Sequence, residues 1–230
     1  MSTPWRQAFR SFYYQDLPDL PDIVLPCRET ALLVIDLQRC YLPDHPAAGE
    51  SAESWARWAP FRERLRRSVV PNTQRLLARF RGDGASVLFA RIACLTPDGC
   101  DRSLSQARPG FNNLLLPLHA PESQILDSVA PLATEIVVTK TTDSALTGTN
   151  LRLLLHNLGI RRVVVAGIFT DQCVASTVRS LADESFDVVV VEDACAAGTE
   201  ELHRAELTIL NNIYCQVLSC DETLSALTRP

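Results

Sequence analysis

The stretch Arg162-Val-Val-Val-Ala-Gly-Ile-Phe-Thr-Asp-Gln-Cys173 decides the fold, because it joins a short apolar run to a polar segment that ends in a thiol. A run of this length, rich in β-branched residues, is typical of a parallel strand that is buried on both faces. We expect a strand over 162–168 and a helix that begins near Thr170 or Asp171. Cys173 would then lie at the start of that helix, just beyond the carboxyl end of the strand.

Two other apolar runs have the same form, and each ends in a charged residue. Ala31-Leu-Leu-Val-Ile-Asp36 ends in an acid, and Glu135-Ile-Val-Val-Thr-Lys140 ends in an amine. In an open α/β sheet, ligands bind in the crevice at the carboxyl ends of the strands. We therefore expect Asp36, Lys140 and Cys173 to converge in one pocket.

The rest of the chain alternates strand and helix patterns. Strands are expected over 86–92, 187–191 and 216–219, and helices over 55–81, 150–158 and 200–211. Pro71 must kink or interrupt the first of these helices, and Thr149 and Gly159 are expected to cap and end the second. The alternation predicts an α/β fold with a doubly wound, mostly parallel six-stranded sheet and helices on both faces, a Rossmann-like arrangement.

Length and composition predict one domain preceded by an arm. The chain has 230 residues, of which 47% are hydrophobic and 21% charged, which is ordinary for a globular protein with a single core. Residues 1–28 form the expected N-terminal arm, in which Trp5, Phe9 and Phe12 have helical spacing, and residues 29–230 form the domain. The arm would cover the core or lie on a partner subunit.

Composition also argues against several partners and cofactors. The net charge of −5 is unlike the basic face of nucleic-acid readers, and no apolar stretch reaches the length that spans a bilayer. Without a secretory signal, the eight cysteines are expected to be reduced thiols in a cytoplasmic protein. No glycine-rich phosphate fingerprint and no zinc-binding spacing occur, so neither a nucleotide cofactor nor a metal is expected.

Three groups of residues have less specific patterns. The segment 93–125 is long, rich in proline and irregular, which is typical of a lid or a binding loop; whether it closes over the site stays open. Arg91, Arg102 and Arg108 lie on or after the second strand and could bind a substrate carboxylate. A further cluster is expected to form a solvated helix face. It comprises Arg62, Glu63, Arg64, Arg66 and Arg67.

The position of Cys173 is compatible with a nucleophile. A helix N-terminus carries unpaired amides and positive potential, which lower the pKa of a thiol and can hold an oxyanion. A small buried residue is the competing interpretation, and position alone supports both equally. Asp36 could accept the thiol proton and pass it to a leaving amine, while Lys140 keeps Asp36 ionised and favours the thiolate. A structural salt bridge would explain Asp36 and Lys140, but not the thiol beside them.

Over about residues 31–224 the chain resembles the isochorismatase-like cysteine hydrolase superfamily. The matching stretches are Ala31-Leu-Leu-Val-Ile-Asp-Leu-Gln38, Val138-Thr-Lys140, Gly148-Thr-x-Leu151, Gly167-Ile-Phe-Thr-Asp-Gln-Cys-Val174 and Val191-Glu-Asp-Ala194. The resemblance implies an isochorismatase-like fold with Asp36, Lys140 and Cys173 as the catalytic residues. It also implies a cis peptide bond before Phe169, which turns backbone amides toward the oxyanion position.

We therefore expect a hydrolase that cleaves a C–N bond of a small amide or ureide-like substrate through a thioester, without a cofactor. The amides of Phe169 and Cys173 would stabilise the oxyanion. Weaker candidates for substrate binding are Gln38, Tyr41, Arg91 and Thr170. The family usually assembles, so a homo-oligomer is expected, with the small-molecule substrate as the other partner.

Departures from the family pattern define the alternatives. Nicotinamidases of the superfamily carry an Asp-x-His metal site where this chain has Arg91-Ile-Ala-Cys-Leu-Thr96, so metal-dependent nicotinamide cleavage is disfavoured. The isochorismate-cleaving branch typically has a small residue in place of Cys173 and a histidine where Asp171 stands. Vinyl-ether hydrolysis with Asp36 as general acid is therefore the second hypothesis. The third is a non-catalytic or thiol-redox protein with Cys173 as its sensor.

Overall fold

The computed structural model describes residues 8–109 and 114–229, so the predicted helical position of Trp5 lies outside the described residues. Its centre is a six-stranded sheet in the order β4-β3-β2-β5-β6-β7, in which every neighbouring pair is parallel. The strands are β2 (Thr30–Ile35), β3 (Ser86–Ile92), β4 (Ile136–Lys140), β5 (Arg162–Ile168), β6 (Asp187–Ala196) and β7 (Gln216–Leu218). The predicted doubly wound α/β fold is confirmed.

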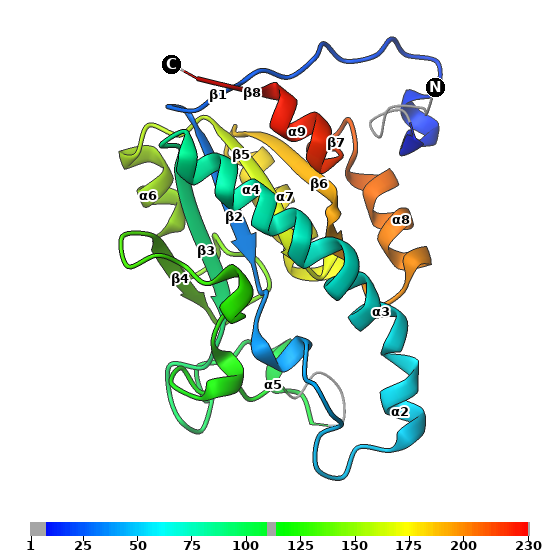
Figure 1. Cartoon of the computed structure of the whole chain (residues 1–230), viewed down its shortest axis with the longest axis vertical. Helices are drawn as coiled ribbons and strands as arrows, with labels where there is room; N and C mark the ends of the chain where they lie inside the picture. The colour runs from blue at the N-terminus through cyan, green and yellow to red at the C-terminus, as the bar shows by residue number, and fades with distance from the viewer. Residues whose placement is uncertain (1–7, 110–113, 230) are drawn as a thin grey trace.

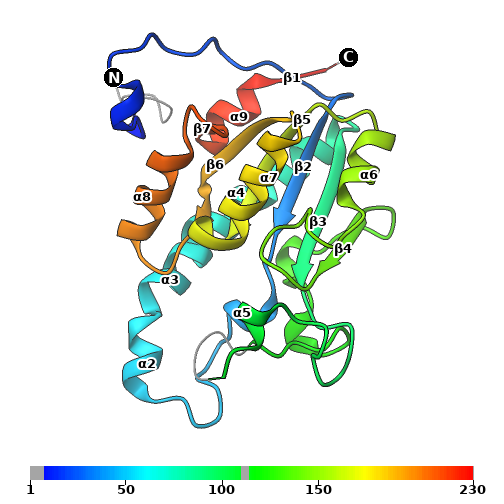
Figure 2. The same cartoon turned by 180° about the vertical axis from the view of Figure 1, so that it is seen from behind.

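Helices cover both faces of this sheet (Figure 1 and, from behind, Figure 2). One face carries α6 (Leu151–Asn157), α7 (Ala175–Asp183) and α8 (Glu200–Leu210), and the other carries α3 (Ala59–Arg64), α4 (Val70–Gly82) and α9 (Cys220–Ala226). Leu33 of β2 packs on the first face, whereas Leu32 and Val34 pack on the second. Successive strand side chains point to opposite faces, so the unbroken apolar run of β2 is buried on both.

The helical pattern predicted over 55–81 is divided into several pieces. These are α2 (Ala52–Arg57), α3, a π-helical turn named η3 (Leu65–Val69) and α4. Pro60 and Pro71 lie within the first two positions of α3 and α4, where the missing proline amide costs no helical hydrogen bond. At Pro71 the chain changes from the π-helical turn η3 to α4 without leaving the helical conformation, so the predicted disturbance is a change of hydrogen bonding and not a break. Within the described residues, no helix combines the length and the apolar character needed to cross a membrane.

Several element boundaries differ from the predictions, and those of α6 and β6 have a visible structural basis. The N-cap of α6 is Asn150, not Thr149. The Thr149 hydroxyl still accepts a hydrogen bond from the amide of Leu151 (3.1 Å), the first helical residue. β6 continues to Ala196 instead of ending at 191. After a bulge near Val165 it resumes its pairing with β5, and this pairing keeps the strand extended.

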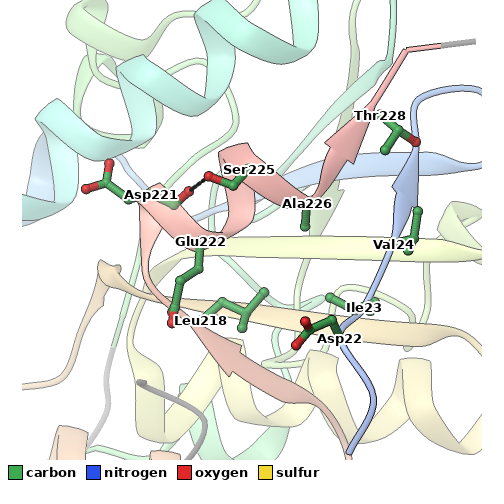
Figure 3. A pocket seen from close by; sticks show the side chains of 9 residues that line it. All are labelled: Asp22, Ile23, Val24, Leu218, Asp221, Glu222, Ser225, Ala226 and Thr228. Atoms are coloured by element: carbon green, nitrogen blue, oxygen red, sulfur yellow. Dashed lines mark hydrogen bonds between the residues drawn. The ribbon is translucent and has the colours of Figure 1, made fainter. Parts of the chain in front are cut away.

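The N-terminal arm lies along the C-terminal segment. β1 (Leu25–Pro26) pairs in parallel with β8 (Leu227–Thr228), and Phe9 is buried while Phe12 is exposed. A pocket lies between the arm and α9, and Figure 3 shows the side chains that line it. Its volume is about 520 Å³. Its apolar floor contains Ile23 and Leu218, and its polar groups are mostly carboxylates. Among the described residues, this lining shares no member with the pocket that contains Cys173.

Candidate active site

Asp36, Lys140 and Cys173 meet at the carboxyl edge of the sheet, toward which the arrowheads of β2, β3 and β4 point in Figure 1. Asp36 follows β2, Lys140 ends β4, and Cys173 lies in a π-helical turn after β5, named η6 (Thr170–Val174). Nζ of Lys140 donates to Oδ2 of Asp36 at 2.7 Å and to Sγ of Cys173 at 3.2 Å. The structure thus brings together an acid, an amine and a thiol from three separate elements.

A glycine at the end of β5 makes this approach possible. Gly167 has a φ of +125°, and a Cβ at this position would lie 2.0 Å from the carbonyl oxygen of Ile35. Only glycine tolerates both the backbone conformation and the close contact with β2. The following peptide bond, between Ile168 and Phe169, is cis, which confirms the expectation drawn from the resemblance.

Backbone contacts orient the residues beyond the strand ends. The Thr177 hydroxyl donates to the carbonyl of Cys173 (2.7 Å) and accepts from the amide of Ala145 (3.0 Å), so it ties η6 to the loop after β4. Asp36 has a φ of +52°, in the left-handed region that side-chain-bearing residues rarely adopt. Such conformations cluster at functional sites, and here it turns the chain sharply out of β2.

The three side chains are nearly removed from solvent. The exposed fractions are 1% for Lys140, 2% for Asp36 and 6% for Cys173. A third hydrogen bond from Lys140, to the carbonyl of Thr142 at 3.3 Å, satisfies its ammonium group. Oδ1 of Asp36, in contrast, is buried without a hydrogen-bond partner among the described residues. That oxygen is available to accept a proton or to hold a water molecule.

The protonation of the site differs from the expectation for a helix N-terminus. Burial, together with the negative charge of Asp36, raises the pKa of Cys173 above its usual 9.0, and the charge of Lys140 only opposes this. The prediction of a lowered thiol pKa is therefore wrong. Burial also raises the pKa of Asp36 against the attraction of Lys140. Burial alone would lower the pKa of Lys140, but Asp36 and Cys173 together outweigh it and raise that pKa, so the amine keeps its proton.

We expect the alkylation rate of Cys173 to keep rising as pH increases above 9.0, because the thiolate is the reactive form and burial raises the thiol pKa. Iodoacetamide labelling at a series of pH values, followed by mass spectrometry of the Cys173 peptide, measures this rate. The exposed Cys100 in the same sample reports on the reagent. A rate that is already level at neutral pH would contradict the raised pKa and favour a redox sensor, since sensor thiols have low pKa values and are accessible.

A pocket of about 450 Å³ opens over Cys173, within the range of small-molecule sites. Beyond the strand ends in Figure 1 lie α2, α3 and the loop that carries α5 (Leu104–Ala107). The wall of the pocket contains five aromatic residues, which are Tyr41, Trp55, Trp58, Phe61 and Phe169. The ring of Phe169 lies 5.3 Å from that of Tyr41, edge to face, and 4.9 Å from that of Phe61. The pocket is therefore suited to an apolar or planar ligand.

Of the weaker substrate-binding candidates, only Tyr41 belongs to the described lining of this pocket. Gln38 is fully buried, and its side-chain amide donates to the carbonyls of Ile92 (2.9 Å) and Ser123 (2.8 Å). Arg91 donates to the side chain of Gln124 at 2.7 Å. Gln38 and Arg91 therefore hold the backbone and loops beside the site, away from the space that a substrate would occupy.

Thr170 belongs to a buried polar network behind the pocket. Its hydroxyl lies 2.8 Å from Nδ1 of His203, whose Nε2 lies 3.2 Å from Oε1 of Glu192. Arg64 donates to that same carboxylate oxygen at 2.8 Å. The expectation of a solvated face is thus wrong for Arg64, which is half-buried, and for Arg62, which is buried; Arg66 and Arg67 are exposed.

We expect the free energy of unfolding to fall as pH decreases below about 4.5, more steeply in the wild type than in Glu192→Gln. Burial would raise the pKa of Glu192, but hydrogen bonds from His203 and Arg64 outweigh it and hold that pKa below its usual range. A depressed carboxyl pKa contributes stability above the unfolded-state pKa, and this is lost as pH falls through the folded-state pKa. Urea unfolding at neutral pH and at several pH values below 4.5 measures the effect. The same pH dependence in both proteins would contradict it.

Three features of the site escaped the sequence analysis. Arg62 lines the pocket although its neighbours in the sequence suggested a surface helix. The aromatic wall includes Trp55 in α2 and Trp58 between α2 and α3, where aromatic spacing alone indicates packing. Asp143 lines the pocket, with Oδ1 3.9 Å from Sγ of Cys173. Its position three residues after Lys140 was the signal that could have revealed it.

Residues 30–222 match the family model described as the isochorismatase domain. The chain belongs to the isochorismatase family. It is 29% identical over 205 residues to the isochorismatase family protein YddQ of Bacillus subtilis, covering 85% of this chain and 98% of that protein. It is also 29% identical over 231 residues to the ureidoacrylate amidohydrolase RutB of Pseudomonas syringae, covering 90% of this chain and 91% of that protein.

The fold of this family member is also found in solved structures. A cysteine hydrolase from Pseudomonas syringae pv. phaseolicola superposes with a TM-score of 0.74 at 21% identity, covering 91% of this chain and 98% of that one. At this identity the likeness concerns the fold alone. The protein is thus a hydrolase of the isochorismatase family, as the sequence analysis predicted. In the described part of the chain, no group of three or more His, Cys, Asp or Glu residues is placed to hold a metal ion.

Proposed function

We propose that this isochorismatase-family hydrolase cleaves a C–N bond of a small amide or ureide-like substrate, with Cys173 as the nucleophile. The observation that carries the proposal is the contact of one buried ammonium, Lys140, with both the Asp36 carboxylate (2.7 Å) and the Cys173 thiol (3.2 Å). This cluster lies at a pocket of about 450 Å³, large enough for a small molecule. Similarity to a ureidoacrylate amidohydrolase over 90% of the chain supports the C–N substrate class.

Acylation follows from this arrangement. The thiol of Cys173 passes its proton to Asp36 as Sγ attacks the carbonyl carbon, so the buried thiol need not be ionised beforehand. Lys140 stabilises the charge on sulfur and carboxylate, and the amides of Phe169 and Cys173 hold the oxyanion. When the tetrahedral intermediate collapses, the C–N bond breaks and Asp36 protonates the departing nitrogen. A thioester and free ammonia or amine result.

Deacylation reuses the same groups. Asp36 accepts a proton from water as the water oxygen attacks the thioester carbonyl. The C–S bond then breaks, the acid product leaves, and the proton held by Asp36 returns to Sγ of Cys173. The buried, unpartnered Oδ1 of Asp36 supports this shuttle role.

Ammonia release from a panel of small amides, ureides and carbamoylated amines tests the proposal, with wild type and Cys173→Ala measured side by side. Release by the wild type alone is the expected result. The vinyl-ether hypothesis predicts a different result, because its mechanism requires the Asp36 carboxyl group but not the Cys173 thiol. Suppose that neither protein releases ammonia from the panel, and that isochorismate is cleaved by the wild type and by Cys173→Ala but not by Asp36→Asn. The vinyl-ether hypothesis would then replace the proposal.

A further inference from the structure

Arg62 of α3 is a buried cation in the wall of the same pocket. Arg62 is 6% exposed, and among the described lining residues no other side chain is a lysine or an arginine. Its Nη2 donates to the carbonyl of Trp55 at 2.6 Å, and its guanidinium carbon lies 3.5 Å from the centre of the Trp55 ring. Within the described residues, no carboxylate pairs with it, whereas Arg64 two positions later pairs with Glu192 and Glu200.

Burial of a guanidinium without an anion is unfavourable, since a charge taken out of water needs a partner. A guanidinium presents five N–H donors in a rigid fork that matches a carboxylate. The carbonyl of Trp55 occupies part of this fork, and the Trp55 ring covers one of its faces. A ligand that brings an anion into the pocket would supply the missing partner.

The other charged groups of the lining do not fill this role. Oε1 and Oε2 of Glu50 accept hydrogen bonds from the Ser54 hydroxyl (3.0 Å) and the Ala47 amide (3.2 Å). Asp143 accepts from the side chain of Gln106 at 3.3 Å. Both acids are therefore held by their own neighbours, while the aromatic wall around Phe169 offers apolar surface for the body of a ligand.

We infer that Arg62 binds a carboxylate of the substrate, and that the substrate is an amide or ureide that also carries an apolar, planar group. The amide part of this inference rests on the proposed function. The anion subsite does not, because it can be measured without turnover. The competing explanation is that Arg62 only anchors α2 through Trp55, which predicts no preference for an anionic ligand.

Calorimetric titrations with phenylacetate and with phenylacetamide test the subsite, because the two compounds differ in charge but hardly in shape. We expect the wild type to bind the acid at least about tenfold more tightly than the amide, the effect of one charge-assisted hydrogen-bonded pair. Arg62→Met should erase this preference, and Arg62→Lys should retain part of it. Arg67→Met, which removes the same charge from an exposed position of η3, should bind like the wild type. Circular dichroism establishes whether each variant is folded.

A second measurement keeps the test independent of the variants. Phenylacetate, but not phenylacetamide, should slow the alkylation of Cys173 in the wild type, which locates the bound acid in this pocket. Equal affinities, absence of binding by either compound, unprotected Cys173 or a preference that survives in Arg62→Met would each overturn the inference. Acid binding without ammonia release from any substrate would remove the proposed function and leave the subsite. Ammonia release without a preference for the carboxylate ligand would remove the subsite and leave the proposed function.

Discussion

Replacing Cys173 by alanine is expected to lower the rate of ammonia release by about 10⁴-fold or more on any substrate that the wild type cleaves. Without Sγ no thioester can form, and the remaining pocket contributes only binding and oxyanion stabilisation. The thiol is small and buried beside Lys140, so the substitution should leave the fold intact. The turnover number from continuous ammonia detection measures the loss, and circular dichroism verifies the fold.

Cys215→Ala is the matched control for this variant. Cys215 is also a buried thiol, but it precedes β7 and therefore lies at the amino edge of the sheet, opposite the site. The Cys215→Ala variant should retain the turnover number of the wild type. If Cys173→Ala retained turnover as well, the nucleophile would have to be another group, and the thioester route would be abandoned.

Replacing Lys140 by methionine is expected to lower the free energy of unfolding by about 3–5 kcal/mol, the usual cost of breaking a buried ion pair from one side. Methionine fills a similar volume but leaves the Asp36 carboxylate without its counter-charge at 2.7 Å. The thiol also loses its ammonium contact at 3.2 Å, so ammonia release should be lost in the same variant. Urea unfolding monitored by tryptophan fluorescence and by circular dichroism measures the stability change.

The double variant Asp36→Asn/Lys140→Met separates the two effects. Neutral side chains at both positions remove the uncompensated charge, so the free energy of unfolding should recover most of the loss seen in Lys140→Met. Turnover should stay absent, because neither the proton acceptor nor the ammonium remains. If Lys140→Met unfolded at the same urea concentration as the wild type, the Asp36 carboxylate would not depend on this ion pair.

The fold and the three strand-end residues could be predicted from local sequence patterns, because those patterns carry the responsible physics. Apolar, β-branched runs of strand length must be buried on both faces, as β2 and β5 are. Parallel strands place their carboxyl ends at one edge, so Asp36 and Lys140 meet although 104 residues separate them. Pro71 likewise marks the point where the π-helical turn η3 gives way to α4, because proline lacks a backbone amide.

Charge state and side-chain direction were decided only by the tertiary structure. A helix start indicated a low thiol pKa, yet burial and the approach of Asp36 raise it. An arginine-rich helix indicated a solvated face, yet Arg62 points into the pocket and Arg64 reaches Glu192, 128 residues away. Desolvation and charge–charge interaction depend on which atoms surround a group in space. Many of those neighbours, such as Asp36 for Cys173 and Glu192 for Arg64, come from distant segments, and local spacing in the chain does not specify them.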